Sequence, residues 1–181
     1  MPKRGTPALS APLPLDLKLI TLTTHTDNRG EVAEIWRQEW LPETGFVQEN
    51  ISVSHYGVVR GLHFQRKYPQ GKLISVLSGE ICDIALDIRP HSATFGKYHR
   101  QILSSQTPQL LWIPPHFAHG FAVFSEMAVV LYKMSDYYHA DDQATIRWDD
   151  KTLNIDWGIT TPTVSEKDQN GIFWKDFLCE F

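Results

Sequence analysis

Three short blocks of the sequence place polar side chains among apolar neighbours. The blocks span 59–65, 112–121 and 131–133, and a lysine lies between the first two. A histidine can accept a proton near neutral pH, a tyrosine can donate one, and an ammonium can stabilise the anion formed between the two steps. These residue types together indicate proton abstraction next to a carbonyl group. The side chains concerned are Arg60, His63, Lys72, His116, His119, Tyr132 and Lys133.

The same histidines allow a metal site as an alternative. His63, His116 and His119 could be ligands in a double-stranded β-helix, where a His-x-His pair and a carboxylate are the usual requirement. Here the second position of the pair is Gln65, and Lys72 stands where an acidic ligand would help. Because an ammonium repels a divalent cation, we expect no bound metal. A lone histidine is more often a hydrogen-bonded core residue, but the other polar side chains around His63 favour catalysis.

Short strands must position these side chains. Residues 81–88 alternate, with Cys82, Ile84, Leu86 and Ile88 on one face and Asp83, Ala85 and Asp87 on the other. Closely spaced strands of this kind predict an antiparallel sandwich or barrel, in which one face of each strand lines the interior. We therefore expect the polar blocks to line a wet, functional interior. The expected strands are 73–77, 81–88, 98–103, 109–113, 120–123 and 128–134.

The two ends of the chain differ from this middle. Residues 1–14 contain four prolines and read as a flexible arm, which leaves 15–181 as a single domain. We expect a strand with a register shift over 15–22, a turn at 26–30, and either a strand or a short helix over 34–41. Ser165 and Asp168 have the spacing of a capping box, so a short helix should begin near 165 and end by Gly171. The apolar segment 172–181 should pack on the body or on a second subunit.

Composition narrows the class of protein. The chain has 181 residues, with 17 Lys and Arg against 21 Asp and Glu, for a formal charge of −4. This balance argues against nucleic acid or an anionic membrane as the main partner. No apolar run reaches the length of a membrane span. Two cysteines, Cys82 and Cys179, are too few for a disulfide framework and predict a reduced, cytoplasmic protein.

Ordered blocks over about residues 15–170 resemble a known enzyme family. The matching blocks are 27–30, 46–50, 59–65, 70–73, 87–89, 94–96, 112–121, 131–133, 137–138 and 165–168. Together they are similar to the dTDP-4-dehydrorhamnose 3,5-epimerase family. The resemblance implies an all-β, cupin-type jelly roll with a few short helices, a homodimer, and neither metal nor other cofactor. It also implies epimerisation of an NDP-4-keto-6-deoxyhexose at C3 and C5 through an enolate.

The resemblance assigns roles residue by residue. His63 matches the base, Asp168 the carboxylate that orients it, Tyr132 the general acid on the opposite face of the sugar, and Lys72 the cation near the enolate oxygen. Arg60 suits a diphosphate because its guanidinium presents a fork of donors. Arg29 could come from the neighbouring subunit. The positions matched to nucleotide-sugar contacts are Arg29, Glu34, Gln48, Asn50, Arg60, His119, Tyr138, Gln143 and Lys167.

Simpler structural interpretations stay open beside these roles. Asp168 could act only in the capping box, Tyr132 could be strand packing, and Arg89 could be a surface charge or a partner of Asp87. Tyr137 and Tyr138 could be core residues, or one could stack on a nucleobase.

The sequence also departs from the family pattern. Glu31, Val32 and Ala33 follow Gly30, where the family commonly carries aromatic residues, and Gln143 replaces a frequent Glu. A mono-epimerase, a ketoisomerase acting on another NDP-keto-sugar, and a cupin without epimerase activity are therefore the alternatives.

Overall fold

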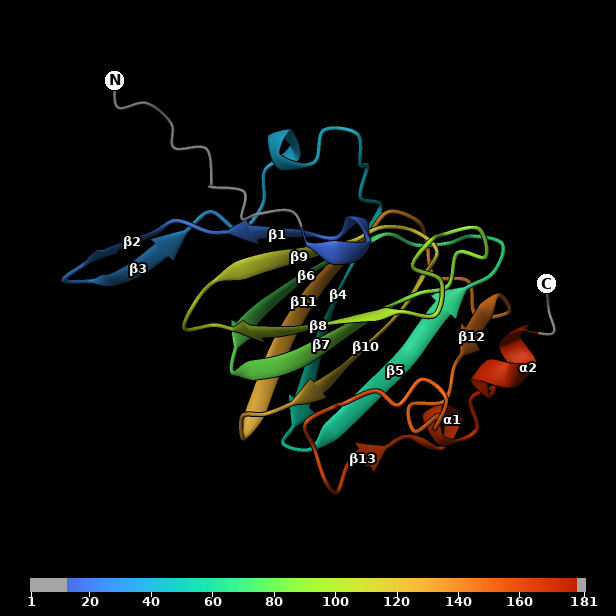
Figure 1. Cartoon of the computed structure of the whole chain (residues 1–181). Helices are drawn as coiled ribbons and strands as arrows, with labels where there is room; N and C mark the ends of the chain where they lie inside the picture. Colours follow the sequence, from blue (N-terminus) through green and yellow to red (C-terminus); the bar gives the residue numbers. More distant parts are fainter. Residues whose placement is uncertain (1–12, 179–181) are drawn as a thin grey trace.

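The computed structural model describes residues 13–178 and consists mainly of two β-sheets that face each other (Figure 1). The first sheet has the strand order β1-β9-β6-β11-β4, and the second has the order β12-β5-β10-β7-β8, with β13 beside β5. Strands β2 and β3 form a separate hairpin. The strands are β1 (Lys18–Thr21), β2 (Thr24–Asp27), β3 (Gly30–Ala33), β4 (Gln48–His55), β5 (Val58–Gln65), β6 (Lys72–Ser78), β7 (Glu80–Asp87), β8 (Tyr98–Ser104), β9 (Gln109–Ile113), β10 (Phe117–Val123), β11 (Met127–Met134), β12 (Gln143–Thr145) and β13 (Thr163–Val164).

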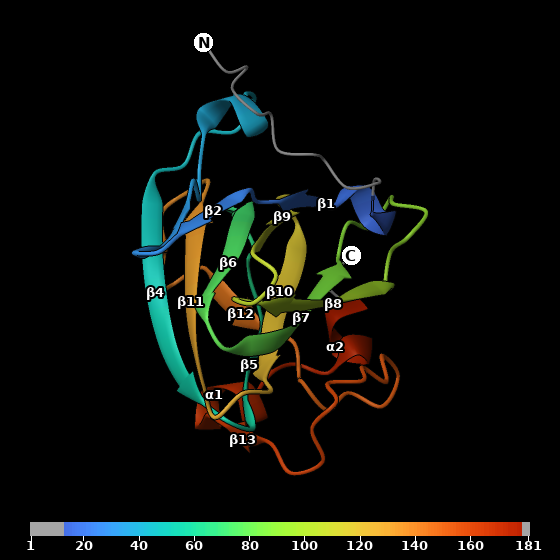
Figure 2. The ribbon, with the colours of Figure 1, turned by 90° about the vertical axis from the view of Figure 1, so that its left-hand side faces the viewer.

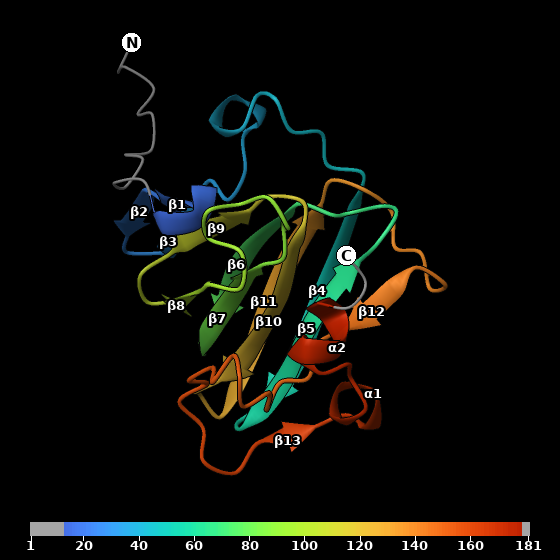
Figure 3. The ribbon, with the colours of Figure 1, turned by 45° about the vertical axis from the view of Figure 1, so that its right-hand side comes forward.

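The helical elements are short and lie outside the sheets. They are the 3₁₀ turns η1 (Pro14–Asp16) and η2 (Gln38–Trp40) and the α-helices α1 (Glu166–Gln169) and α2 (Trp174–Leu178). Figure 3 shows α1, α2 and β13 grouped beside β5. This all-β jelly-roll arrangement agrees with the fold expected from the sequence, and the strands of the middle region lie where their alternation predicts them.

Alternating side chains divide the apolar residues into an inner and an outer layer. Ile81 and Ala85 of β7 face inward and pack with Ile74, Val130 and Phe121 between the sheets. Cys82, Ile84, Leu86 and Ile88 share one face, as their alternation predicts; the structure shows that this face is the outer one, covered by Trp174 and Phe177 of α2. The apolar segment after residue 171 therefore packs on the body as far as it is described, and Cys179 and Phe181 lie outside the described residues.

The buried carboxylate of Asp87 binds side chains of the loop that follows β7. Asp87 accepts hydrogen bonds from the Arg89 guanidinium, at 2.7 and 2.9 Å, and from the hydroxyls of Ser92 and Thr94, at 2.7 and 2.6 Å. Burial would raise the pKa of Asp87, but these hydrogen bonds outweigh burial and hold the pKa well below its usual value. Of the two roles open to Arg89, the structure shows the structural pair.

The N-terminal region differs from the sequence expectation. Instead of a strand over 15–22, η1 precedes a shorter β1, and Leu15 and Asp16 have φ of 69° and 64°. Pro14 at the start of η1 favours a turn over an extended strand. Most of the proline-rich arm lies outside the described residues. The expected turn at 26–30 joins β2 and β3, and only η2 forms within 34–41.

The predicted helix start at Ser165 is confirmed, with Ser165 as the N-cap. The Ser165 hydroxyl accepts the backbone N–H of Asp168 at 3.2 Å and begins α1. The helix ends at Gln169, two residues before Gly171. None of the helices within residues 13–178 is long and apolar enough to cross a membrane.

Candidate active site

A histidine and a carboxylate form a close pair at the centre of β5. His63 Nε2 lies 2.6 Å from Asp168 Oδ1, and the Asp168 side chain is 4% exposed. Burial would raise the pKa of Asp168, but the hydrogen bond and charge attraction from His63 outweigh it, so the pKa lies below its usual value. Because an ionised carboxylate accepts the Nε2 proton, the neutral ring keeps Nδ1 free to take a proton.

Two glycines let β5 and β10 approach closely next to this pair. A Cβ on Gly61 would stand 2.6 Å from the Cα of Gly120, and Gly61 has φ of 121°, which favours glycine. The Gly61 N–H donates to the second oxygen of Asp168 at 3.3 Å. Gly61 therefore holds the carboxylate while it leaves room for the neighbouring strand, and Asp168 serves both the capping box and His63.

Tyr132 and Lys72 come from the opposite sheet. Tyr132 of β11 pairs in register with Ile74 of β6, and Met134 pairs with Lys72, so Tyr132 and Lys72 share the inner face of neighbouring strands. Figure 2 shows β11 and β6 side by side in one layer. Lys72 is buried, and burial lowers its pKa to about 8 although attraction by Asp83 opposes the shift. His63 and Tyr132 thus lie on facing sheets.

A second histidine–carboxylate pair lies beside the first. His119 of β10 pairs in register with His63, and its Nε2 lies 2.8 Å from Asp83 Oδ2. Burial lowers the pKa of His119, although Asp83 opposes the shift. Asp83 is fully buried. It was not among the site residues predicted from the sequence, although its alternation with Cys82 and Ile84 placed it on the face of the strand opposite to those side chains.

Further polar side chains connect β4 with β5 and with the segment that precedes β12. The Arg60 guanidinium donates to the buried Ser54 hydroxyl at 2.9 Å. The Gln48 amide donates to Asn50 at 3.2 Å, and the backbone N–H of Tyr138 donates to Gln48 at 2.8 Å. These contacts place Gln48 and Asn50 on one face of β4, as their spacing predicts.

Gln143 connects this group to α1. Its side-chain oxygen accepts the Tyr138 hydroxyl at 2.7 Å and the Lys167 ammonium at 2.5 Å. Lys167 directly precedes Asp168. The structure therefore joins Tyr138, Gln143 and Lys167 into one chain of contacts next to the His63 pair.

Four residues singled out from the sequence lie elsewhere. Arg29 sits in the β2–β3 turn and pairs with Asp27, and Glu34 pairs with Arg37. The hairpin extends away from the two large sheets (Figure 1). Lys133 pairs with Glu49 at 2.6 Å and faces away from the interior, because it alternates with Tyr132. His116 is exposed in the turn before β10. Lys133 and His116 are therefore not part of the interior group that the sequence predicted.

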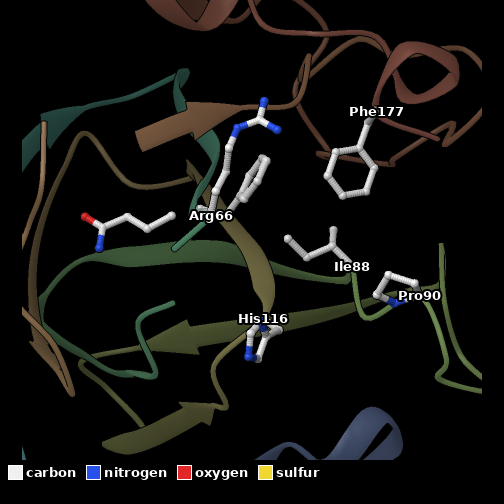
Figure 4. A pocket seen from close by; sticks show the side chains of 7 residues that line it. Arg66, Ile88, Pro90, His116 and Phe177 are labelled. Atoms are coloured by element: carbon white, nitrogen blue, oxygen red, sulfur yellow. The ribbon is translucent and has the colours of Figure 1, made fainter. Parts of the chain in front are cut away.

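A cavity of about 210 Å³ lies at one end of the second sheet (Figure 4). Its labelled side chains are Arg66, Ile88, Pro90, His116 and Phe177. A smaller hollow shares His116 with it and reaches Lys72. Neither hollow is lined by His63 or Tyr132. These two candidate catalytic side chains therefore lie outside both hollows, on the inner faces of the two sheets.

Within residues 13–178 no three His, Cys, Asp or Glu side chains gather in a way that could hold a metal ion.

Comparison with known proteins gives a consistent result. The family model described as dTDP-4-dehydrorhamnose 3,5-epimerase matches residues 13–176. A protein of that name from Neisseria gonorrhoeae is 44% identical over 164 residues, which cover 88% of this chain and 50% of that protein. This chain thus spans about half the length of that relative. A protein of the same name from Methanothermobacter thermautotrophicus is 42% identical, and the match covers 87% of each chain.

The solved structures show the same similarity. A dTDP-6-deoxy-D-glucose-3,5-epimerase from Legionella pneumophila, in complex with dTDP-4-keto-L-rhamnose, superposes with a TM-score of 0.85 at 42% identity. The match covers 89% of each chain.

Proposed function

The chain belongs to the dTDP-4-dehydrorhamnose 3,5-epimerase family, and from this premise we propose how it epimerises dTDP-4-keto-6-deoxy-D-glucose at C3 and C5. The observation that carries the mechanism is the placement of the His63–Asp168 pair on one sheet and of Tyr132 and Lys72 on the sheet that faces it. A sugar held between the sheets meets a base on one side and an acid on the other.

The first step is removal of a proton next to the ketone. The C4 carbonyl acidifies the C–H bonds at C3 and C5, because the electrons left on carbon move onto the oxygen. His63 Nδ1 takes the proton, and the ring becomes an imidazolium. The negative charge of Asp168, 2.6 Å away, stabilises that cation and fixes the ring orientation.

The second step returns a proton from the other side. Lys72 stabilises the enolate oxygen in an interior with little water, where charge interactions are strong. The Tyr132 hydroxyl then gives its proton to the carbon, the enolate collapses to the ketone, and the configuration is inverted. Solvent reprotonates Tyr132 and removes the proton from His63. Reorientation of the ring presents the second carbon to the same groups, and the two inversions leave the oxidation state unchanged.

Cationic and aromatic side chains around the His63–Asp168 pair have the chemistry to bind a nucleotide. Arg60 and Lys167 offer donors to the diphosphate, and the half-exposed ring of Tyr138 offers a face to a nucleobase. Gln48 and Asn50 lie together on β4, and Gln48 contacts the backbone of Tyr138. His119 completes the proposed contacts to the sugar.

We propose that the enzyme is a homodimer. Ile51 and Val53 of the edge strand β4, Met127 of the adjacent β11 and Leu77 of β6 are between 42% and 59% exposed on the outer face of the first sheet. A row of exposed apolar side chains on an edge strand is the surface that a second copy covers. Arg29 on the protruding hairpin would then reach the partner's site.

The free thiol of Cys82 supports a reducing, cytoplasmic location.

The activity is tested by incubating dTDP-4-keto-6-deoxy-D-glucose with the purified chain and identifying the product by NMR. We expect the L-lyxo 4-keto sugar, which has inverted C3 and C5. A product inverted at one carbon would make the chain a mono-epimerase, one of the alternatives that the sequence leaves open. A UDP-linked substrate serves as the control for the nucleotide, and faster turnover of that substrate would contradict the thymidine assignment.

A further inference from the structure

Asp83 is a fully buried carboxylate on β7, and it binds His119, which pairs in register with His63. It pairs in register with Phe121 of β10, and both lie on the inner face with Ile81 and Ala85. One carboxylate oxygen accepts the Nε2 proton of His119 at 2.8 Å. The other oxygen is buried and has no hydrogen-bond partner among the described residues. Burying a carboxylate with an unpaired oxygen costs free energy, unless a nearby positive charge compensates the negative charge.

Lys72 supplies the opposite charge. Its ammonium donates to the backbone carbonyl of His63 at 3.3 Å, and Lys72 and Asp83 attract each other across the interior. Burial alone favours the neutral amine, and the attraction by Asp83 opposes that preference. The charged and titratable side chains on the elements around Lys72 are His63 from β5, Asp83 from β7, His116 from the turn before β10, His119 from β10 and Tyr132 from β11. Asp83 is the anion that acts on Lys72, and the other nearby carboxylate, Asp168, is bound to His63.

His119 gains a defined tautomer from the same contact. Burial lowers the pKa of His119, so the neutral ring is favoured near neutral pH. A neutral ring that donates Nε2–H to Asp83 keeps Nδ1 as an acceptor. His119 can then accept a hydrogen bond from a sugar hydroxyl, while Lys72 presents its positive charge to the enolate oxygen.

We propose that Asp83 is a positioning residue of the epimerase, which holds the Nε2–H of His119 and keeps the Lys72 ammonium charged beside the ketone. The proposal rests on the proposed function and assigns a task to a residue that the mechanism otherwise leaves unused. Asp83 does not touch the reacting carbons. Its effect passes through the charge of Lys72 and the ring of His119.

Asp83→Asn tests this proposal, because the amide can still accept a hydrogen bond but carries no charge. We expect the alkaline limb of the pH–rate profile for deuterium incorporation to move to lower pH by about one unit or more. At pH 8 the rate should fall about fivefold or more, with a smaller loss at pH 6. Asp83→Glu keeps the charge and should leave the limb at the wild-type pH, whatever its rate.

Asp87→Asn is the matched control. It removes another fully buried carboxylate from the same strand, but that carboxylate binds Arg89 and does not act on Lys72. The alkaline limb of this variant should stay at the wild-type pH. An equal loss of rate at every pH in Asp83→Asn, or an equal shift in Asp87→Asn, would overturn the proposal.

A second measurement separates this inference from the proposed function. The titration of Lys72 can be followed by NMR of protein labelled with ¹³C-lysine, which needs no turnover. Asp83→Asn should titrate Lys72 at lower pH than the wild type, and Asp83→Glu should not. If the wild type epimerises nothing, the proposed function fails, but the Lys72 titration still decides the role of Asp83. An unchanged titration in Asp83→Asn would refute it.

Discussion

At the scale of the residue, we assign the two proton transfers to His63 and Tyr132, which lie on facing sheets. His63→Ala removes the base and leaves Asp168 without its partner. We expect deuterium incorporation from D₂O to fall at both C3 and C5 by about 10²-fold or more, since one base serves both carbons. Mass spectrometry of the recovered sugar measures it. Full exchange at either carbon would mean that another group is the base there.

Tyr132→Phe keeps the ring and removes the hydroxyl. Because the base is intact, the enolate should still form and exchange should continue. Inversion should be lost, since no acid returns a proton from the other side. NMR of the product distinguishes exchange from inversion. Inversion of both carbons at the parent rate would show that Tyr132 is not the acid.

Lys72 gives the reaction a pH limit. Burial lowers its pKa to about 8, so the ammonium is present below that pH and is lost above it. The rate of enolate formation should therefore decline as the pH rises through about 8. Lys72→Arg should keep its charge across that range and show no decline there. A wild-type rate that is level from pH 7 to pH 10 would contradict this role for Lys72.

At the scale of the element, the Asp87 cluster ties the loop after β7 to the barrel. The pKa of Asp87 is lower in the folded state than in the unfolded chain. The unfolded chain therefore binds the proton more readily, and the stabilisation present above about pH 4 is lost as the pH falls below it. Asp87→Asn should reduce the free energy of unfolding by about 2 to 3 kcal/mol at pH 7, because it leaves a buried network unpaired.

Urea unfolding at several pH values checks this prediction. The difference between wild type and Asp87→Asn should shrink between pH 5 and pH 3. Asp149→Asn removes a partly exposed partner of Arg147 and should change the free energy of unfolding by less than about 1 kcal/mol. If both variants lose the same free energy of unfolding, the buried Asp87 cluster stabilises the fold no more than the partly exposed Arg147–Asp149 pair does.

The sequence predicted elements where local rules decide the structure. Alternation over 81–88 placed Asp83 and Ile84 on opposite faces of the strand, and the spacing of Ser165 and Asp168 marked the start of α1. The boundaries of β1 and the 34–41 segment could not be predicted, because proline turns and 3₁₀ geometry there depend on tertiary packing. The pairing of Asp83 with His119 was also beyond prediction, since strand order is a property of the whole sheet.

At the scale of the whole molecule, the outer face of β4 predicts association. Val53 lies 55% exposed near the middle of this strand. Val53→Lys places a charge where a second copy would bury the side chain, so the variant should be a monomer at micromolar concentration. Analytical ultracentrifugation measures the mass, and Thr160→Lys, in an exposed loop, should remain dimeric. A wild type that is monomeric at high concentration would refute the dimer.

The central claim is that one base and one acid on facing sheets invert both carbons next to the ketone. Its most direct test is the reaction of dTDP-4-keto-6-deoxy-D-glucose in D₂O, with deuterium located by mass spectrometry and NMR. The account predicts one deuteron at C3 and one at C5 in the inverted product. No deuterium at either carbon, with folded protein in hand, would contradict the mechanism.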